Sequence, residues 1–530
     1  MRTGVFLLVP VSTVFLTAAA YPPFNVEILA WMGLAPLLFA LRRAGPVEGS
    51  AMALLTGVLF FMATFSWVGK IPEIGVQNWL LLMVAPLSFY FLIFGILYRV
   101  ISRNTGSWII LGAPSLWTAL EYARSHLFFL SVPWNLLAHS QYRHLPVIQI
   151  ADITGVYGIS FLMGMVNQLI SEVPEFVVAG KAGSLPDSTG YCRKINGPLH
   201  LLTVAVLLVL SLSYGWYRLV PPANAEHLRL AMIQGNLVTK NKMPYAEQVK
   251  HLKVYDHLTR LAAKKSPDLI IWPASSLPAP INASLLVRSA VSRLTRDTNS
   301  HLLAGGAGYE KLGPPKDGYL PYSNSEFLIS PSGRLEAQYN KIRLVPFNEY
   351  IPFQGKITWP GWISTIKKSF IPGDSYTIFR VKDAAFGSPI CWENLFSNHF
   401  RRFVKDGANF MVSVTNEGFY GPTAGPYQTM AMTVFRAIEN RVAIARSSTT
   451  GVSAIINPDG KIVEKIQDAD GKDLFVSGFL VRNVPLSNKK TIYTRCGDIF
   501  AYGIIGITLL CIVISITGIK PRGHRRLTEK

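Results

Sequence analysis

The sequence predicts a membrane protein in two parts, a multi-span α-helical membrane domain and an α/β domain outside the membrane. Half of the 530 residues are hydrophobic and only 15% are charged, and the mean hydropathy is +0.29. Apolar runs of about 20 residues, the length that crosses a bilayer, crowd the chain before residue 220 and recur once near its end. Between them, short runs rich in Val, Ile and Leu alternate with helical patterns, which is typical of a layered α/β architecture.

The N-terminal part, residues 1–220, is predicted to be a membrane domain of about seven transmembrane helices. Its apolar runs fall at 4–20, 25–41, 51–69, 78–100, 107–123, 147–171 and 198–218. The first run ends in three alanines, as a signal peptide does, but further spans follow directly, so we interpret it as a retained helix. Residues 497–530 predict a last transmembrane helix over 499–519 and a basic cytoplasmic tail, 520–526.

The distribution of charge predicts a topology. Basic residues occupy alternate loops, which should therefore be cytoplasmic; they are Arg2, Arg42 with Arg43, Arg99 with Arg103, and Lys181 with Arg193 and Lys194. Seven crossings from a cytoplasmic start place residues 226–486 on the outer side. The same rule accounts for the net charge of +20. No basic stripe interleaved with aromatic residues is present, so we expect no nucleic-acid partner.

Within residues 226–486 the apolar runs and turn signals define the expected elements. The expected strands are 228–234, 269–272, 301–306, 325–329, 408–415, 441–447 and 452–456, and the expected helices are 245–264, 285–298 and 427–441. Residues 457–460 and 330–333, each with Pro and Gly, predict tight turns between strands.

Cys391 is the residue around which the α/β part is organised. The other cysteines, 192, 496 and 511, form no Cys-x-x-Cys pair with it, so neither a disulfide framework nor a metal site is expected, and no cofactor. A small apolar run reaches Cys391, and polar residues that could open a helix follow at once. A thiol at such a strand-to-helix turn has a lowered pKa and suits nucleophilic catalysis. The alternative is a buried structural cysteine.

Two further segments give Cys391 a context. One contains Tyr339-Asn-Lys341 and continues as Ile-Arg-Leu-Val-Pro-Phe-Asn-Glu349, and the other is Trp-Pro-Ala274-Ser-Ser. With Cys391 they resemble the nitrilase superfamily, whose active site is a glutamate, a lysine and a cysteine in that order. The apolar spans on both sides make the chain similar to the apolipoprotein N-acyltransferases of the bacterial inner membrane.

The resemblance implies a nitrilase-like αββα sandwich for residues 226–486 and a role for each site residue. Cys391 would be the nucleophile and Lys341 the group that stabilises the oxyanion. Glu349 and Glu393 would support them, with Glu349 the better substitute base. Position 274 is that of the general base.

Alanine at position 274 departs from the family pattern, because it has no group that accepts a proton. Loss of a general base costs on the order of a hundred- to ten-thousandfold in rate. An engineered, inactive Glu→Ala form is the favoured explanation, since the surrounding motif is intact. The other is a natural variant that uses a different carboxylate or is no longer catalytic.

The activity that the resemblance implies is N-acylation of lipoproteins at the outer face of the inner membrane. A phospholipid, typically phosphatidylethanolamine, would give an acyl chain to Cys391 as a thioester, and the α-amino group of a diacylglyceryl-cysteine at the N-terminus of an apolipoprotein would then take it. Two alternatives remain open. One is a membrane-tethered amidase or nitrilase that acts on a small soluble substrate, and the other is a non-catalytic lipid- or lipoprotein-binding homologue, which Ala274 favours.

Overall fold

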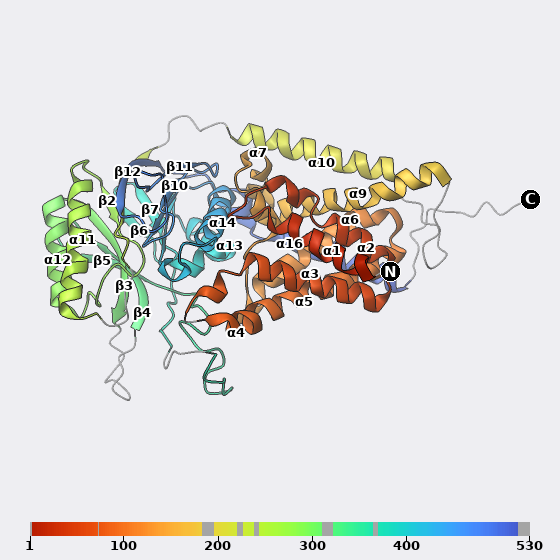
Figure 1. Ribbon diagram of the computed structural model, residues 1–530. Coiled ribbons are helices and arrows are strands. Elements are labelled where there is room, and N and C mark those ends of the chain that lie inside the picture. The colour runs from red at the N-terminus through yellow and green to blue at the C-terminus, as the bar shows by residue number, and fades with distance from the viewer. Residues whose placement is uncertain are drawn as a thin grey trace, which may run out of the picture.

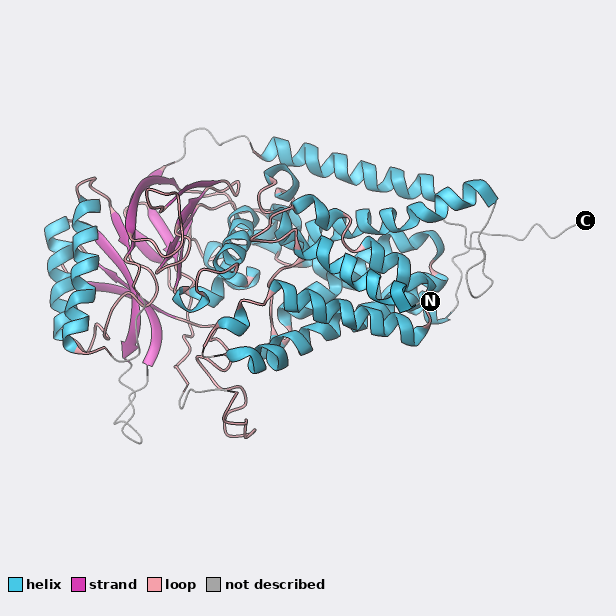
Figure 2. Ribbon diagram, in the orientation of Figure 1, coloured by secondary structure: helices cyan, strands magenta, loops and turns pink. Residues whose placement is uncertain are grey.

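The computed structural model describes residues 3–72, 74–182, 196–219, 226–237, 243–309, 322–363 and 369–517. A bundle of helices forms one end of the molecule and two β-sheets form the other (Figures 1 and 2). The expected basic tail at 520–526, the topology residues Arg2, Arg193 and Lys194, and Cys192 lie outside the described residues.

The bundle consists of helices from the first 220 residues and two from the C-terminal part. They are α1 (Thr3–Ala18), α2 (Ala35–Arg43), α3 (Pro46–Thr64), α4 (Gly75–Trp79), α5 (Ala85–Asn104), α6 (Ile109–His126), α7 (Leu145–Ile148), α8 (Ala151–Thr154), α9 (Val156–Ala182), α10 (Gly197–Arg218), α15 (Ile492–Cys496) and α16 (Ile499–Thr517). A π-helical turn, Leu80–Val84, joins α4 to α5. Among the described residues, five helical stretches are long and apolar enough to cross a membrane: Pro46–Thr64, Gly75–Arg103, Val156–Pro174, Gly197–Arg218 and Ile499–Thr517.

Two of the expected spans are not single helices. Residues 25–41 form a 3-10 turn, Glu27–Trp31, and then the nine-residue α2. Nine residues of α-helix rise about 14 Å, which is less than half of a bilayer core. Residues 147–171 are broken at Gly155, whose φ of +66° ends α8 before α9 begins. A side chain at Gly155 would also meet the ring of Tyr493 at 2.7 Å, so the break lies where two segments touch.

The α/β part contains two six-stranded sheets. The first has the order β12-β1-β2-β3-β4-β5, with β1 (His227–Gln234), β2 (Leu269–Ile271), β3 (His301–Tyr309), β4 (Tyr322–Ile329), β5 (Leu335–Asn340) and β12 (Gly478–Pro485). The second has the order β11-β10-β9-β8-β7-β6, with β6 (Phe379–Val381), β7 (Ala384–Gly387), β8 (Phe410–Thr415), β9 (Ile444–Ser448), β10 (Ala454–Ile456) and β11 (Ile462–Lys465). In each sheet the central strands are parallel and the edge pairs antiparallel.

Helices cover both outer faces of the paired sheets. Helices α11 (Tyr245–Ala263) and α12 (Leu285–Thr298) pack on the first sheet through residues such as Tyr255 and Val291. Helices α13 (Ser397–Lys405) and α14 (Gly425–Asn440) lie on the other side, between the second sheet and the bundle (Figure 1). The result is the expected nitrilase-like αββα sandwich, attached to a multi-span helical domain.

Helix α14 joins the two parts of the molecule. Every residue of α14 except Tyr427 is buried, because one side of the helix faces the sandwich and the other faces α8, α15 and the turn Leu137–Gln141 of the bundle. A single apolar core therefore runs from the bundle, through α14, into the space between the sheets.

Candidate active site

Cys391 lies at a sharp turn between a strand and a helical turn. The chain leaves β7 at Gly387, bridges to β8 through Ile390 and Val414, and enters a 3-10 turn over Cys391–Leu395. Cys391 itself has a φ of +52°, a conformation that non-glycine residues adopt rarely and mostly where the surrounding fold imposes it. The turn presents a half-buried thiol at the carboxyl end of the central strands. The sequence predicted a strand-to-helix turn at Cys391. The structure has this turn, but a 3-10 turn stands where the first turn of an α-helix was expected.

Lys341 follows the last residue of β5, and its backbone amide donates to the Asn324 carbonyl at 2.8 Å. Its side chain is only 1% exposed and its ammonium donates to both oxygens of Glu349, at 2.7 and 2.9 Å. Burial alone would lower the pKa of Lys341, but the charges of Glu349 and Cys391 outweigh it, so the pKa lies above its usual value. The lysine is therefore a fixed cation whose field reaches the thiol.

Glu349 is fully engaged in holding that lysine. Besides the two bonds from Lys341, it accepts from the backbone amide of Val345 at 2.8 Å and from the side-chain amide of Asn324 at 3.0 Å. A carboxylate with four donors around it orients the ammonium and has little capacity left to take a proton from a thiol.

Glu393 ties the cysteine turn to the lysine loop. Its carboxylate accepts from the backbone amide of Ile390, directly before the cysteine, at 2.8 Å. It also accepts from the amides of Ile342 and Arg343, directly after the lysine, at 2.7 and 2.9 Å, and the Tyr339 hydroxyl donates to it at 2.9 Å. Glu393 is a positioning residue, because its bonds fix two backbone segments and leave no oxygen directed at a substrate.

Ala274 lies just beyond the end of β2, in a loop that folds over β3. The amide of Trp272 donates to the Leu303 carbonyl at 2.8 Å and that of Leu277 to the Gly305 carbonyl at 2.9 Å. Ala274 is 2% exposed and belongs to the core between the sheets. The side chain at position 274 thus faces the interior that also contains the Tyr339 end of β5.

Aromatic residues from both parts of the molecule meet beside Cys391. The ring of Trp392, the next residue, lies 6.3 Å from that of Trp134, and Tyr420 lies 4.7 Å from Trp67. Both indole N–H groups, of Trp67 and Trp134, donate to the side-chain oxygen of Gln428 in α14. No spacing in the sequence links these residues, since they come from segments far apart in the chain.

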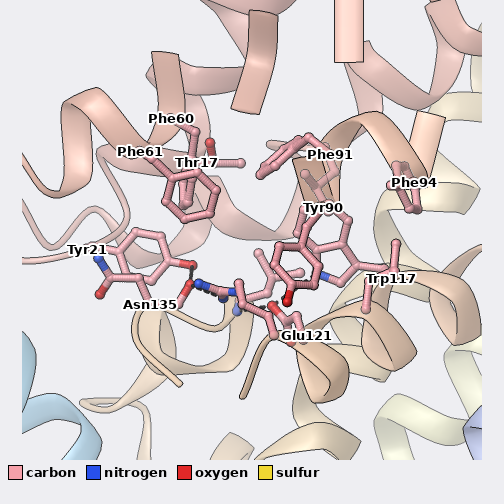
Figure 3. A pocket seen from close by; sticks show the side chains of 14 residues that line it. Thr17, Tyr21, Phe60, Phe61, Tyr90, Phe91, Phe94, Trp117, Glu121 and Asn135 are labelled. Carbon is pink, nitrogen blue, oxygen red and sulfur yellow. Dashed lines mark hydrogen bonds between the residues drawn. The ribbon is translucent and has the colours of Figure 1, made fainter. Parts of the chain in front are cut away.

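A cavity inside the bundle lies next to this aromatic contact but contains none of the site residues. It is lined by aromatic side chains such as Tyr21, Phe60 and Trp117, with Glu121 at its base (Figure 3). Arg124, which also lines it, donates to the carbonyl of Trp134 at 2.8 Å. The cavity wall therefore holds the segment that carries Trp134 against the site.

A second aromatic cluster connects the loop after α6 to the loop that follows Lys341. The ring of Phe128 stacks on Phe353 with centroids 6.1 Å apart, and Phe129 meets Phe347 and Phe353 edge-on. Phe128 is 78% exposed and Phe353 41%. The sequence alone indicates no site at Phe128 and Phe129, because paired aromatic residues in apolar segments usually only pack.

A carbon–nitrogen hydrolase sandwich, with a cysteine, a lysine and supporting glutamates, on a multi-span membrane domain defines a membrane-bound acyltransferase of the nitrilase superfamily. Residues 229–477 match the carbon–nitrogen hydrolase family, and residues 14–169 match the apolipoprotein N-acyltransferase N-terminal domain. An apolipoprotein N-acyltransferase from Geobacter metallireducens is 31% identical over 94% of this chain and 93% of its own length. The chain belongs to the apolipoprotein N-acyltransferase family.

Other chains are similar as well. An apolipoprotein N-acyltransferase from Chlorobaculum tepidum is 27% identical over 94% of this chain and 93% of its own length. Among solved structures, an amidase of the nitrilase superfamily from Nesterenkonia AN1 covers 50% of this chain and 93% of its own, with 19% identity and a TM-score of 0.36.

Proposed function

We propose that this chain moves an acyl chain from a membrane phospholipid to the α-amino group of the N-terminal diacylglyceryl-cysteine of a lipoprotein. The observation that supports it most directly is the Lys341–Glu349 pair, buried beside the thiol of Cys391. A buried cation near a thiol stabilises both the thiolate and the oxyanion that forms when the thiolate attacks a carbonyl.

In the first half of the proposed reaction the Cys391 sulfur attacks the ester carbonyl of the donor. The Lys341 ammonium stabilises the tetrahedral oxyanion, the ester C–O bond breaks, and a lysophospholipid leaves while the acyl chain stays on sulfur as a thioester. In the second half the lipoprotein amine attacks the thioester and the C–S bond breaks. Both halves need a group that accepts and returns a proton. Ala274 cannot do this, so the chain is impaired unless another carboxylate takes the role.

The proposed location is the bacterial inner membrane, with the αββα domain on the periplasmic side and phosphatidylethanolamine as donor. The N-terminus lies at the end of the bundle opposite the sheets (Figure 1). Helix α2 ends at Arg42 and Arg43, and Arg103 lies in the last turn of α5. Basic residues are enriched on the cytoplasmic side of a membrane, which supports a cytoplasmic location for these helix ends. The exposed Phe128 and Phe353 give the loop beside the site an apolar surface suited to the outer leaflet.

The test is the capture of the acyl-enzyme. The purified chain is incubated with vesicles of phosphatidylethanolamine labelled in one acyl chain, and the Cys391 peptide is examined for a hydroxylamine-sensitive label. The expected result is a thioester on Cys391 that is absent from Cys391→Ala, and that a synthetic diacylated lipopeptide with a free amine discharges to a labelled N-acyl product.

The two alternatives give different results in the same assay. A membrane-tethered amidase would leave the phospholipid intact and hydrolyse short amides. A non-catalytic binding protein, the candidate that Ala274 favours, would carry no label on Cys391 even after Ala274→Glu. Either result would refute the acyltransferase proposal.

A further inference from the structure

Glu326 is a buried carboxyl group outside the hydrogen-bond network of Lys341, Glu349 and Glu393. It lies in β4, is 0% exposed, and neither of its carboxyl oxygens has a hydrogen-bond partner among the described residues. An unpaired carboxyl in a protein interior costs stability, and buried polar groups are nearly always paired. A group kept in this condition is a candidate for chemistry.

The pairing of the strands shows which face of the sheet Glu326 occupies. It stands opposite Gly305 of β3 and Tyr339 of β5. The next residue, Phe327, packs toward α11 and α12, whereas Leu328 belongs to the core between the sheets. Since side chains alternate along a strand, Glu326 points into the space between the sheets.

Asn324, two residues before Glu326, connects this face of the sheet to Lys341. Asn324 shares the face of Glu326, stands opposite Lys341, and donates its side-chain amide to Glu349 at 3.0 Å. The Glu326 carboxyl therefore projects into the same interior as the Lys341–Glu349 pair.

The carboxyl of Glu326 lies directly against residue 274. A Cβ placed on Gly305 would come within 2.3 Å of Glu326 Oε1 and within 2.7 Å of the Cα of Ala274. Both groups thus lie over the same glycine, and only a residue without a side chain leaves room for them. The Glu326 side chain extends over Gly305 toward the Cα of residue 274.

The other glutamates of the site are already engaged. Glu349 has four donors and Glu393 holds the backbone on both sides, so neither has an oxygen free to accept a proton from the thiol. Burial holds the pKa of Glu326 well above its usual value, so its carboxylate is a stronger base than that of an exposed glutamate.

We propose that Glu326 is the general base of this enzyme and replaces the carboxylate that position 274 lacks. The proposal rests on the acyltransferase function above. The Glu326 carboxylate takes the S–H proton of Cys391, directly or through one water, as sulfur bonds to the ester carbon. It returns that proton to the lysophospholipid oxygen as the C–O bond breaks. In the second half it takes a proton from the attacking amine, and returns it to sulfur when the C–S bond breaks.

On this interpretation the pair Ala274 and Glu326 is a natural exchange. The catalytic carboxylate has moved from the loop after β2 to the neighbouring strand β4, with Gly305 providing the space. An engineered Glu→Ala change, the explanation favoured from the sequence, does not account for an unpaired glutamate beside the altered position.

The test compares five forms of the full-length chain in the acyl-enzyme assay: the parent, Ala274→Glu, Glu326→Gln, Glu326→Ala, and the double variant Glu326→Ala with Ala274→Glu. We expect Glu326→Gln and Glu326→Ala to slow thioester formation about a hundred- to ten-thousandfold. In the double variant, the carboxylate restored at position 274 should make thioester formation at least about tenfold faster than in Glu326→Ala. Glu464→Gln, which removes an exposed carboxylate paired with Arg482 on the same domain, is the matched control and should keep the parent rate.

Two further measurements separate chemistry from folding. The apparent Tm of Glu326→Gln should equal that of the parent, because the amide has the same shape and the carboxyl has no bonds to lose. Alkylation of the Cys391 peptide by iodoacetamide should slow in Glu326→Gln, which a purely structural role would not produce.

Each outcome decides between the proposals. A parent thioester that forms at the same rate in Glu326→Gln overturns the assignment of Glu326 and leaves the acyltransferase function in place. A parent without thioester, together with an active Ala274→Glu single variant, also overturns it and supports an inactivated enzyme. Absence of thioester in every form overturns the proposed function and the base assignment together.

Discussion

Glu393→Gln should loosen the active site without changing any residue that the substrate meets. The carboxylate is fully buried and accepts from backbone amides on both sides of the site, at Ile390 and at Ile342 and Arg343. Glutamine retains one acceptor oxygen and replaces the other with an NH₂ group. A backbone N–H of the cysteine turn or of the lysine loop then faces this NH₂ group, which cannot accept a hydrogen bond from it.

The size of the effect follows from those bonds. Each buried donor left without an acceptor costs about 1–3 kcal/mol, and the contact of the carboxylate with His399 Nε2, at 3.3 Å, changes as well. Breaking a buried charged network of this kind costs about 3–5 kcal/mol. At roughly 2 °C per kcal/mol for a domain of this size, the apparent Tm should fall by about 6–10 °C. Thermal unfolding of the detergent-solubilised chain measures it, with Glu464→Gln as the control.

The loss should also depend on pH. Burial alone would raise the pKa of Glu393, but His399 and Lys341 outweigh it, so the pKa in the folded protein lies below the usual value of 4.5. Because the unfolded chain then binds this proton more readily, Glu393 contributes stability above pH 4.5 that disappears as the pH falls through its folded pKa. The difference in Tm between parent and variant should therefore shrink in acid. A variant with the parent's Tm at pH 7 would refute the view that Glu393 holds the two segments together.

Two other changes test the site and its link to the bundle. Lys341→Met leaves Glu349 buried without its cation and should cost about 3–5 kcal/mol while removing the Cys391 thioester. A Tm that stays at the parent value would mean that the pair is not buried as described. Trp134→Phe retains the ring contact with Trp392 but loses the hydrogen bond to Gln428, so the unfolding free energy should fall by about 1 kcal/mol, whereas Trp134→Ala should cost about 3–5 kcal/mol. Equal losses in the two Trp134 variants, measured by thermal unfolding, would argue against a packing role for the indole.

The elements with local signals were the ones that the sequence predicted well. Helix α12 begins and ends as expected, because Ser284 caps its first turn by accepting from the Val287 amide and Asn299 ends it with a φ of +49°. The cysteine turn and the turns at Gly333 and Gly460 were also predicted. Both glycines have the positive φ that such turns require.

The elements that depend on distant partners were not predicted. Strand β5 is a mostly half-exposed run, Leu335–Asn340, and becomes a strand only by pairing with β4. Strand β12 pairs with β1, about 250 residues earlier in the chain. The apolar run 25–41 looks like a span, but Gly33 lies so close to α1 that a side chain there would meet Thr17 at 2.5 Å, and the helix starts again only at Ala35.

Glu326 could not be recognised from the sequence for a related reason. In the chain it is the last of four consecutive polar residues in its strand, and it lies far from Ala274. Only the register that places it opposite Gly305 shows that its carboxyl reaches the loop after β2. A functional group supplied by a neighbouring strand leaves no spacing pattern, because strand pairing determines which residues meet.

The burial of α14 on both sides has a practical consequence for work on this enzyme. A secreted fragment that begins near residue 226 and stops before α15 would uncover the apolar side of α14 that now faces the bundle, including Phe435 against His139. Such a fragment should aggregate or misfold, since large exposed apolar patches drive association. Chimeras between relatives should therefore exchange α14 together with the bundle segments that it touches.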